Sequence, residues 1–185
     1  TLYVTHDQVE GMSMAERIAI MDKGQLHLIG KPTDVYNWPK NLFVAGFMGN
    51  PAMNLLPCCF ESASQQLKIE HTNLAIKLTR NHLDLIRPSI SENLVFGIRP
   101  EHISLSTTSI ASGLKAKVHL VEPLGSANIV DIVLGQVSAD KFVLLRVRTH
   151  PSIVPKSGET VWIQIDPKKI HIFDRSTTLV LSETA

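Results

Sequence analysis

The stretches 115–120 (KAKVHL) and 161–165 (VWIQI) decide how most of this chain folds. Polar and apolar residues alternate in both, and a period of two is typical of a β-strand with one buried face. Further strands are expected at 128–134, 142–148 and 170–173, with proline, glycine and aspartate residues between them. Many short strands separated by regular turns predict a small β-barrel or a β-sandwich.

Residues 1–50 have a different pattern, which indicates the end of an α/β domain. Residues 2–5 (LYVT) read as a short strand that is apolar on both faces, as in a parallel sheet covered by helices. Asp7 is expected to cap the helix that follows, with Glu10 as its capping-box partner.

A β-hairpin and two short helices are expected next. Two apolar runs, residues 17–21 and 25–30, flank the turn at residues 22–24 (DKG), which predicts a hairpin over residues 17–30. The helices are expected at 32–36, where proline lies in the first turn, and at 41–48. Residues 51–57 are expected to link this part to the β domain.

Charge and composition exclude several classes of function. The 185 residues contain 18 Lys+Arg against 17 Asp+Glu, and only 5% are aromatic, so neither a basic footprint nor a stacking platform for nucleic acid is expected. The eight histidines are scattered and the two cysteines, Cys58 and Cys59, are adjacent, so no metal site is expected. Adjacent cysteines rarely bridge, which favours a reducing compartment. No apolar run approaches the roughly 20 residues of a membrane-spanning helix.

Several motifs, in order along the chain, resemble one family. Residues 3–8 (YVTHDQ) resemble the switch-histidine region of ABC transporter ATPases. Residues 51–54 (PAMN), 97–102 (GIRPEH) and 121–125 (VEPLG) resemble landmarks of its C-terminal domain. The chain as a whole resembles the ATP-binding subunit of carbohydrate-type importers, which handle maltose-like sugars, related oligosaccharides or glycerol-3-phosphate.

The resemblance implies a mainly β fold. Residues 51–185 would form an OB-like barrel or sandwich, the TOBE regulatory domain. Residues 1–50 would be an α/β remnant, the C-terminal end of a P-loop nucleotide-binding domain.

The resemblance also implies cofactors and partners. The intact subunit would bind ATP and magnesium and hydrolyse ATP to drive solute uptake. It would act as a homodimer at the cytoplasmic face of the inner membrane, with integral permease subunits and a cytoplasmic regulatory protein as partners.

The family's phosphate-binding motifs are not found in these residues. The sequence contains neither a GxxxxGK[ST] loop nor an LSGGQ signature, and it lacks the acidic pair that holds magnesium. We therefore expect a C-terminal fragment that binds neither ATP nor magnesium alone and has no ATPase activity.

His6 is the candidate catalytic and ATP-contacting residue of the intact subunit. An imidazole can donate to a phosphate oxygen, and the resemblance implies contact with the γ-phosphate. Without the surrounding motif, a histidine where a strand meets a helix is more often incidental.

Arg99, Glu101 and His102 are candidates for regulation, through contact with a ligand or a partner. The alternative is structural: Arg99 and Glu101 satisfy charges at a strand end where Pro100 interrupts the ladder. For Arg146 and Arg148, a basic groove for an anion and a solvated strand face are both open.

Three classes of function follow. The first is the C-terminal part of a transport ATPase subunit. The second is a stand-alone regulatory or small-ligand-binding β module. The third, a nucleic-acid-binding OB-like domain, is disfavoured by the near-neutral charge.

Overall fold

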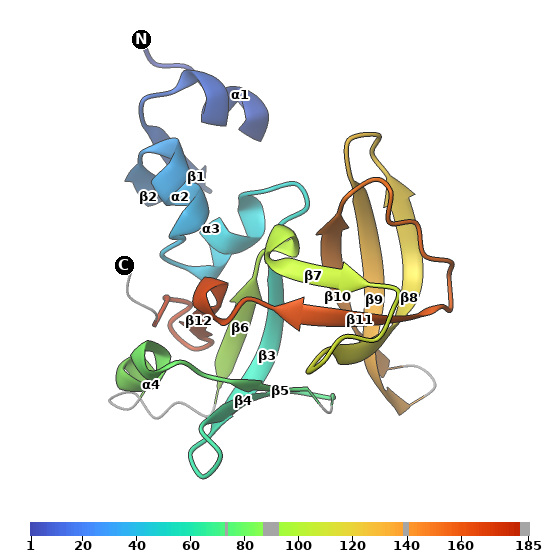
Figure 1. Ribbon diagram of the computed structural model, residues 1–185. Coiled ribbons are helices and arrows are strands. Elements are labelled where there is room, and N and C mark those ends of the chain that lie inside the picture. The colour runs from blue at the N-terminus through green and yellow to red at the C-terminus, as the bar shows by residue number, and fades with distance from the viewer. Residues whose placement is uncertain (73, 87–92, 139–140, 182–185) are drawn as a thin grey trace.

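The computed structural model describes residues 1–72, 74–86, 93–138 and 141–181. Most of the strands lie in two five-stranded antiparallel sheets (Figure 1). The first sheet has the strand order β12-β6-β3-β4-β5 and the second has the order β10-β9-β8-β11-β7. The strands of the first sheet are β3 (Asn54–Glu61), β4 (Gln66–Ile69), β5 (Ala75–Lys77), β6 (Leu94–Ile98) and β12 (His171–Asp174). Those of the second are β7 (Ile103–Ser106), β8 (Leu114–Pro123), β9 (Asn128–Ser138), β10 (Lys141–Thr149) and β11 (Thr160–Ile165).

The chain changes sheets twice, each time through a short 3₁₀ helix that begins with proline. Helix η2 (Pro100–His102) leads from β6 to β7, and helix η3 (Pro167–Lys169) leads from β11 to β12. Proline has no N–H to donate to a ladder, so each ladder ends there. Because β12 returns to the first sheet after all strands of the second, the first sheet is completed only by the last described strand of the chain.

One hydrophobic core lies between the two sheets. It includes Phe96 from the first sheet and Ile132 and Ile163 from the second, all fully buried. On β8, Ala116 and Val118 are buried while the lysines beside them are exposed. The alternation therefore positions the core as predicted, and the mainly β, OB-like fold class is confirmed.

The predicted hairpin and helices of residues 18–48 are confirmed. Strands β1 (Ile18–Asp22) and β2 (Gln25–Gly30) form the hairpin, followed by helices α2 (Pro32–Asn37) and α3 (Leu42–Phe47). One side of α3 packs with the hairpin and α2, in a cluster of Ile20, Val35, Val44 and Met48. On its other side, Ala45 packs with Met53 and Phe173 of the β domain. Helix α3 thus joins the two parts of the chain (Figure 1).

The strand predicted at residues 2–5 is wrong. This segment is not in a strand, and Leu2 and Val4 are 92% and 86% exposed. A strand needs a neighbour to satisfy its backbone, and none of the described strands pairs with these residues.

The start of helix α1 (Gln8–Met14) agrees with the prediction only in part. The Asp7 carboxylate accepts hydrogen bonds from the Val9 and Glu10 amides at 2.7 and 3.2 Å, so the predicted cap is confirmed. The capping box is wrong, because the Glu10 carboxylate accepts from the Thr5 hydroxyl instead, at 2.8 Å.

Two other elements differ from the sequence prediction. The linker predicted at 51–57 is too long, since β3 begins at Asn54. Helix α4 (Arg80–Ile86) was not predicted; it buries His82, Leu83 and Ile86.

Candidate functional site

Arg99 is the centre of the junction between residues 1–50 and the two sheets. It follows β6 directly and is 1% exposed. Its guanidinium donates to the Tyr36 carbonyl at 2.5 Å and to the Met48 carbonyl. These carbonyls lie at the C-terminal ends of α2 and α3, where the helix dipole favours a positive charge. One arginine of the β domain therefore holds two helices of the N-terminal part.

The aromatic ring of Tyr36 completes the surroundings of this cation. The Arg99 guanidinium carbon lies 3.8 Å from the ring centroid, a cation–π contact. The Tyr36 hydroxyl donates to the Glu101 carboxylate at 2.5 Å. Burial and this hydrogen bond raise the pKa of Tyr36 to about 12, while burial lowers the pKa of Arg99. Tyr36, Arg99 and Glu101 therefore form one network.

Gly49 is required by the close approach of the Arg99 guanidinium. Its φ is +110°, a backbone conformation that residues with a side chain rarely adopt. A Cβ on this residue would lie 2.8 Å from Arg99 Nη1. The turn after α3 can therefore carry no side chain at this position without moving Arg99.

The pKa values of two histidines near Arg99 are lowered. Burial and the charge of Arg99 lower the pKa of His171, which is 6% exposed, to about 4. Burial also lowers the pKa of His102, whose Nδ1 atom is buried and has no hydrogen-bond partner among the described residues. Burial is the largest cause of both shifts, and the positive charge of Arg99 acts on both pKa values in the same direction.

His6 lies apart from this network, in the loop before α1. Its side chain is exposed, and Figure 1 places α1 beyond the hairpin and α2, away from the two sheets. The structure therefore brings Arg99 and Glu101 into one network, with His102 close by, and leaves His6 outside it.

Gln8, which the sequence reasoning treated only as part of a motif, connects the His6 loop to the junction. Its side-chain amide donates to the Phe47 carbonyl at 2.6 Å and accepts from the Gly49 amide at 2.7 Å. Its place two residues after His6 in the YVTHDQ motif was the signal available from sequence.

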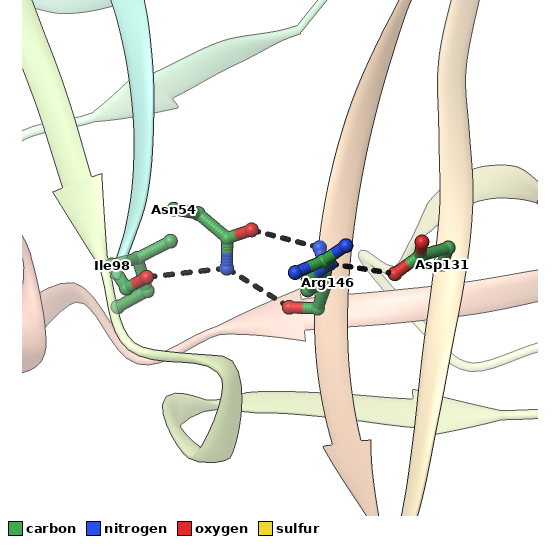
Figure 2. Close-up of polar contacts among 4 residues, drawn as sticks. All are labelled: Asn54, Ile98, Asp131 and Arg146. Carbon is green, nitrogen blue, oxygen red and sulfur yellow. Dashed lines mark hydrogen bonds and ion pairs between the residues drawn. The ribbon is translucent and has the colours of Figure 1, made fainter. Parts of the chain in front are cut away.

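A second polar link lies between the sheets (Figure 2). The Asn54 side chain, at the start of β3, donates to the carbonyls of Ile98 on β6 and Arg146 on β10, at 3.2 and 2.9 Å. It also accepts from the Arg146 amide at 2.8 Å. β10 is the last strand of the second sheet, so the Asn54 amide takes the place of a neighbouring strand there. Arg146 Nε also lies 3.2 Å from Asp131 Oδ1, which favours a solvated, paired strand face over an anion groove.

The described residues contain no group of three His, Cys, Asp or Glu side chains that could hold a metal ion. Cys58 and Cys59 are free thiols. None of the described helices is long and apolar enough to cross a membrane.

Comparison with known proteins defines the class of protein to which the two sheets belong. Residues 49–103 match the MalK OB fold domain, and residues 96–173 match the TOBE domain. The two matches overlap over residues 96–103, the end of β6, η2 and the first residue of β7, where the chain first changes sheets. Together the two matches cover residues 49–173, which agrees with the resemblance to an OB-like TOBE domain that the motifs indicated.

Its relatives identify the family more closely. It is 38% identical to the sulfoquinovosyl glycerol transport ATP-binding protein SmoE of Agrobacterium fabrum, over 95% of this chain and 46% of that protein. It is 36% identical to the sn-glycerol-3-phosphate import ATP-binding protein UgpC of Salmonella typhimurium, over 96% and 46%. The homologues are thus ATP-binding subunits of sugar and glycerol-3-phosphate ABC importers, and the chain spans about half the length of these curated relatives.

A solved structure supports the fold alone. The molybdate-binding protein ModG superposes with a TM-score of 0.50 at 14% identity, over 64% of this chain and 94% of ModG.

Proposed function

We propose that this chain is the C-terminal part of the ATP-binding subunit of an ABC importer for a sugar or for glycerol-3-phosphate. Residues 1–50 end the nucleotide-binding domain, and residues 51–185 form the regulatory domain. The observation that carries the proposal is the similarity to such subunits over 95% of the chain. The motif at residues 3–8 (YVTHDQ) supports it independently. A stand-alone regulatory module is not favoured, because the similarity extends through residues 1–50.

In this function His6 is the residue that meets nucleotide. Its side chain is exposed on a loop that Asp7 and Thr5 hold in place, so its imidazole N–H is free to donate to a phosphate oxygen. Bound MgATP supplies the phosphoanhydride bond whose hydrolysis drives uptake. Phosphoryl transfer depends mostly on positioning and on charge stabilisation, which one histidine does not provide, so the 185 residues alone should not hydrolyse ATP.

The surface of residues 1–14 is consistent with packing against the remainder of a nucleotide-binding domain. Leu2, Val4, Val9 and Met14 are large apolar side chains and are all exposed. Exposed apolar groups gathered in one segment are typical of a surface that another part of a protein covers.

The proposed partners follow from the same family. The intact subunit acts as a homodimer, at the cytoplasmic face of the inner membrane, bound to integral permease subunits. A cytoplasmic regulatory protein acts through the domain of residues 51–185, where Arg99, Glu101 and His102 remain the proposed regulatory residues.

The test is ATP hydrolysis and solute uptake by the intact subunit assembled with its permease. His6→Ala should abolish both without lowering the amount of assembled transporter. His71→Asn is the matched control, because His71 is exposed in a turn with a φ of 60°, which asparagine tolerates. Wild-type turnover in His6→Ala would refute the proposed role of His6.

A further inference from the structure

We propose that Gln8 is a positioning residue that couples the place of His6 to the regulatory domain through the turn at the end of α3. The role of His6 rests on the proposed function. The coupling itself rests on contacts between Gln8, residues 47–49 and Arg99.

Three consecutive residues at the C-terminal end of α3, Phe47, Met48 and Gly49, are held from two directions. Gln8 donates to the Phe47 carbonyl at 2.6 Å and accepts from the Gly49 amide at 2.7 Å. Arg99 donates to the carbonyl of Met48, the residue between them. One turn of backbone is thus bound both by Gln8, two positions after His6, and by Arg99, the residue directly after β6.

Hydrogen bonds within residues 5–10 hold the segment that contains both His6 and Gln8. The Asp7 amide donates to the Thr5 hydroxyl at 2.9 Å, and that hydroxyl donates to Glu10 at 2.8 Å. The Asp7 carboxylate caps α1 at the Val9 amide. Residues 5–10 are therefore joined by a local network of hydrogen bonds around His6. A displacement of Gln8 moves His6 with it.

Helix α1 depends on Gln8 for much of its attachment. None of its residues is buried, and Met12 is only partly buried where it packs against the hairpin cluster. The two hydrogen bonds of Gln8 are therefore the polar contacts that join α1 to the end of α3.

The Arg99 guanidinium cannot move without moving the turn at residues 47–49. The guanidinium is stacked on Tyr36, bonded to the Tyr36 carbonyl and 1% exposed. Gly49 leaves no space for even a Cβ beside it. A shift of the regulatory domain that moves β6 must therefore move the turn at 47–49, and with it Gln8 and His6. Such coupling acts equally in both directions.

The first test uses the 185-residue chain and residue-resolved amide hydrogen exchange. In Gln8→Ala, the Gly49 amide and residues 5–14 should exchange about tenfold faster, as expected when one or two ordinary hydrogen bonds are lost. Amides of the two sheets should be unchanged. Gln25→Ala, an exposed glutamine of the hairpin, is the control and should match wild type throughout. Unchanged exchange of residues 5–14 in Gln8→Ala would overturn the proposal.

The second test perturbs the same turn from the other side. Gly49→Ala forces the guanidinium of Arg99 to move, so residues 5–14 should exchange faster although Gln8 is intact. If this variant does not fold, Arg99→Lys serves instead, because an ammonium group cannot reproduce the planar pair of donors. Folded sheets with wild-type exchange in residues 5–14 would show that Arg99 and His6 are not coupled.

ATP turnover by variants of the intact subunit tests the positioning role of Gln8 separately from the proposed role of His6. In the intact subunit, Gln8→Ala should lower kcat about tenfold and leave KM for ATP unchanged, while Gln25→Ala should leave both unchanged. Wild-type turnover in His6→Ala would refute the proposed function whatever Gln8→Ala does. If His6→Ala is inactive and Gln8→Ala has wild-type kcat, the proposed function stands and the positioning role of Gln8 is wrong.

Discussion

Acidification from pH 7 to pH 5 should lower the free energy of unfolding of this chain through His171. The side chain is 6% exposed, and burial, followed by the charge of Arg99, lowers its pKa from the ordinary 6.5 to about 4. At pH 5 the imidazole is almost fully protonated in the unfolded chain and mostly neutral in the folded one. Linkage converts this difference in bound protons into about 2 kcal/mol lost between pH 7 and pH 5.

The sign of this effect follows from the direction of the shift. A depressed pKa means that the folded state binds fewer protons than the unfolded state. The contribution of His171 is therefore complete above about pH 6.5 and is lost progressively as the pH falls towards 4. The pKa values of His82 and His102 are lowered in the same direction by burial, so they add to the loss.

Urea unfolding at pH 7, 6 and 5, followed by tryptophan fluorescence, measures the effect. His171→Gln should reduce the fall in stability between pH 7 and 5 by about 2 kcal/mol. His71→Asn, at an exposed turn, should keep the wild-type fall. A wild-type stability that does not change over this range, or an unchanged fall in His171→Gln, would refute the reasoning.

Two further predictions concern the polar links. Asn54→Ala removes three hydrogen bonds, of which the two to Arg146 join the sheets, and should lower the free energy of unfolding by about 2 kcal/mol. Arg146 is exposed, so water can replace part of the loss. Urea unfolding measures the effect, and a loss below ~0.5 kcal/mol would contradict the link. Arg99→Lys keeps the charge but not the planar donors that reach Tyr36 and Met48, so it should cost about 3 kcal/mol. A melting temperature equal to that of the wild type would show that the guanidinium geometry is unimportant.

The elements best predicted from sequence are those whose pattern is local. The alternation at 115–120 and 161–165 and the turn at 22–24 depend on neighbours within a few residues, and β8, β11 and the β1–β2 hairpin lie where expected. The strand expected at residues 2–5 failed for the opposite reason, since a strand exists only where another strand pairs with it.

For the candidate site, the sequence predicted which residues matter but not which contacts they make. His6, Arg99, Glu101 and His102 were singled out from motifs, yet the motif could not show that Arg99 is buried against carbonyls 51 and 63 residues away along the chain. Gln8 was missed as a linking residue because its partners, Phe47 and Gly49, are distant in sequence.

Residue order alone thus determines the strands, the hairpin and the family motifs of this chain, because periodicity, turn chemistry and motif spacing are encoded within short windows. Which sheet each strand joins, how β12 returns to β6, and why His171 stays neutral depend on contacts between distant segments. Burial and electric fields arise only when those segments pack together, so the junction at Arg99 and its link to Gln8 exist only in the folded chain.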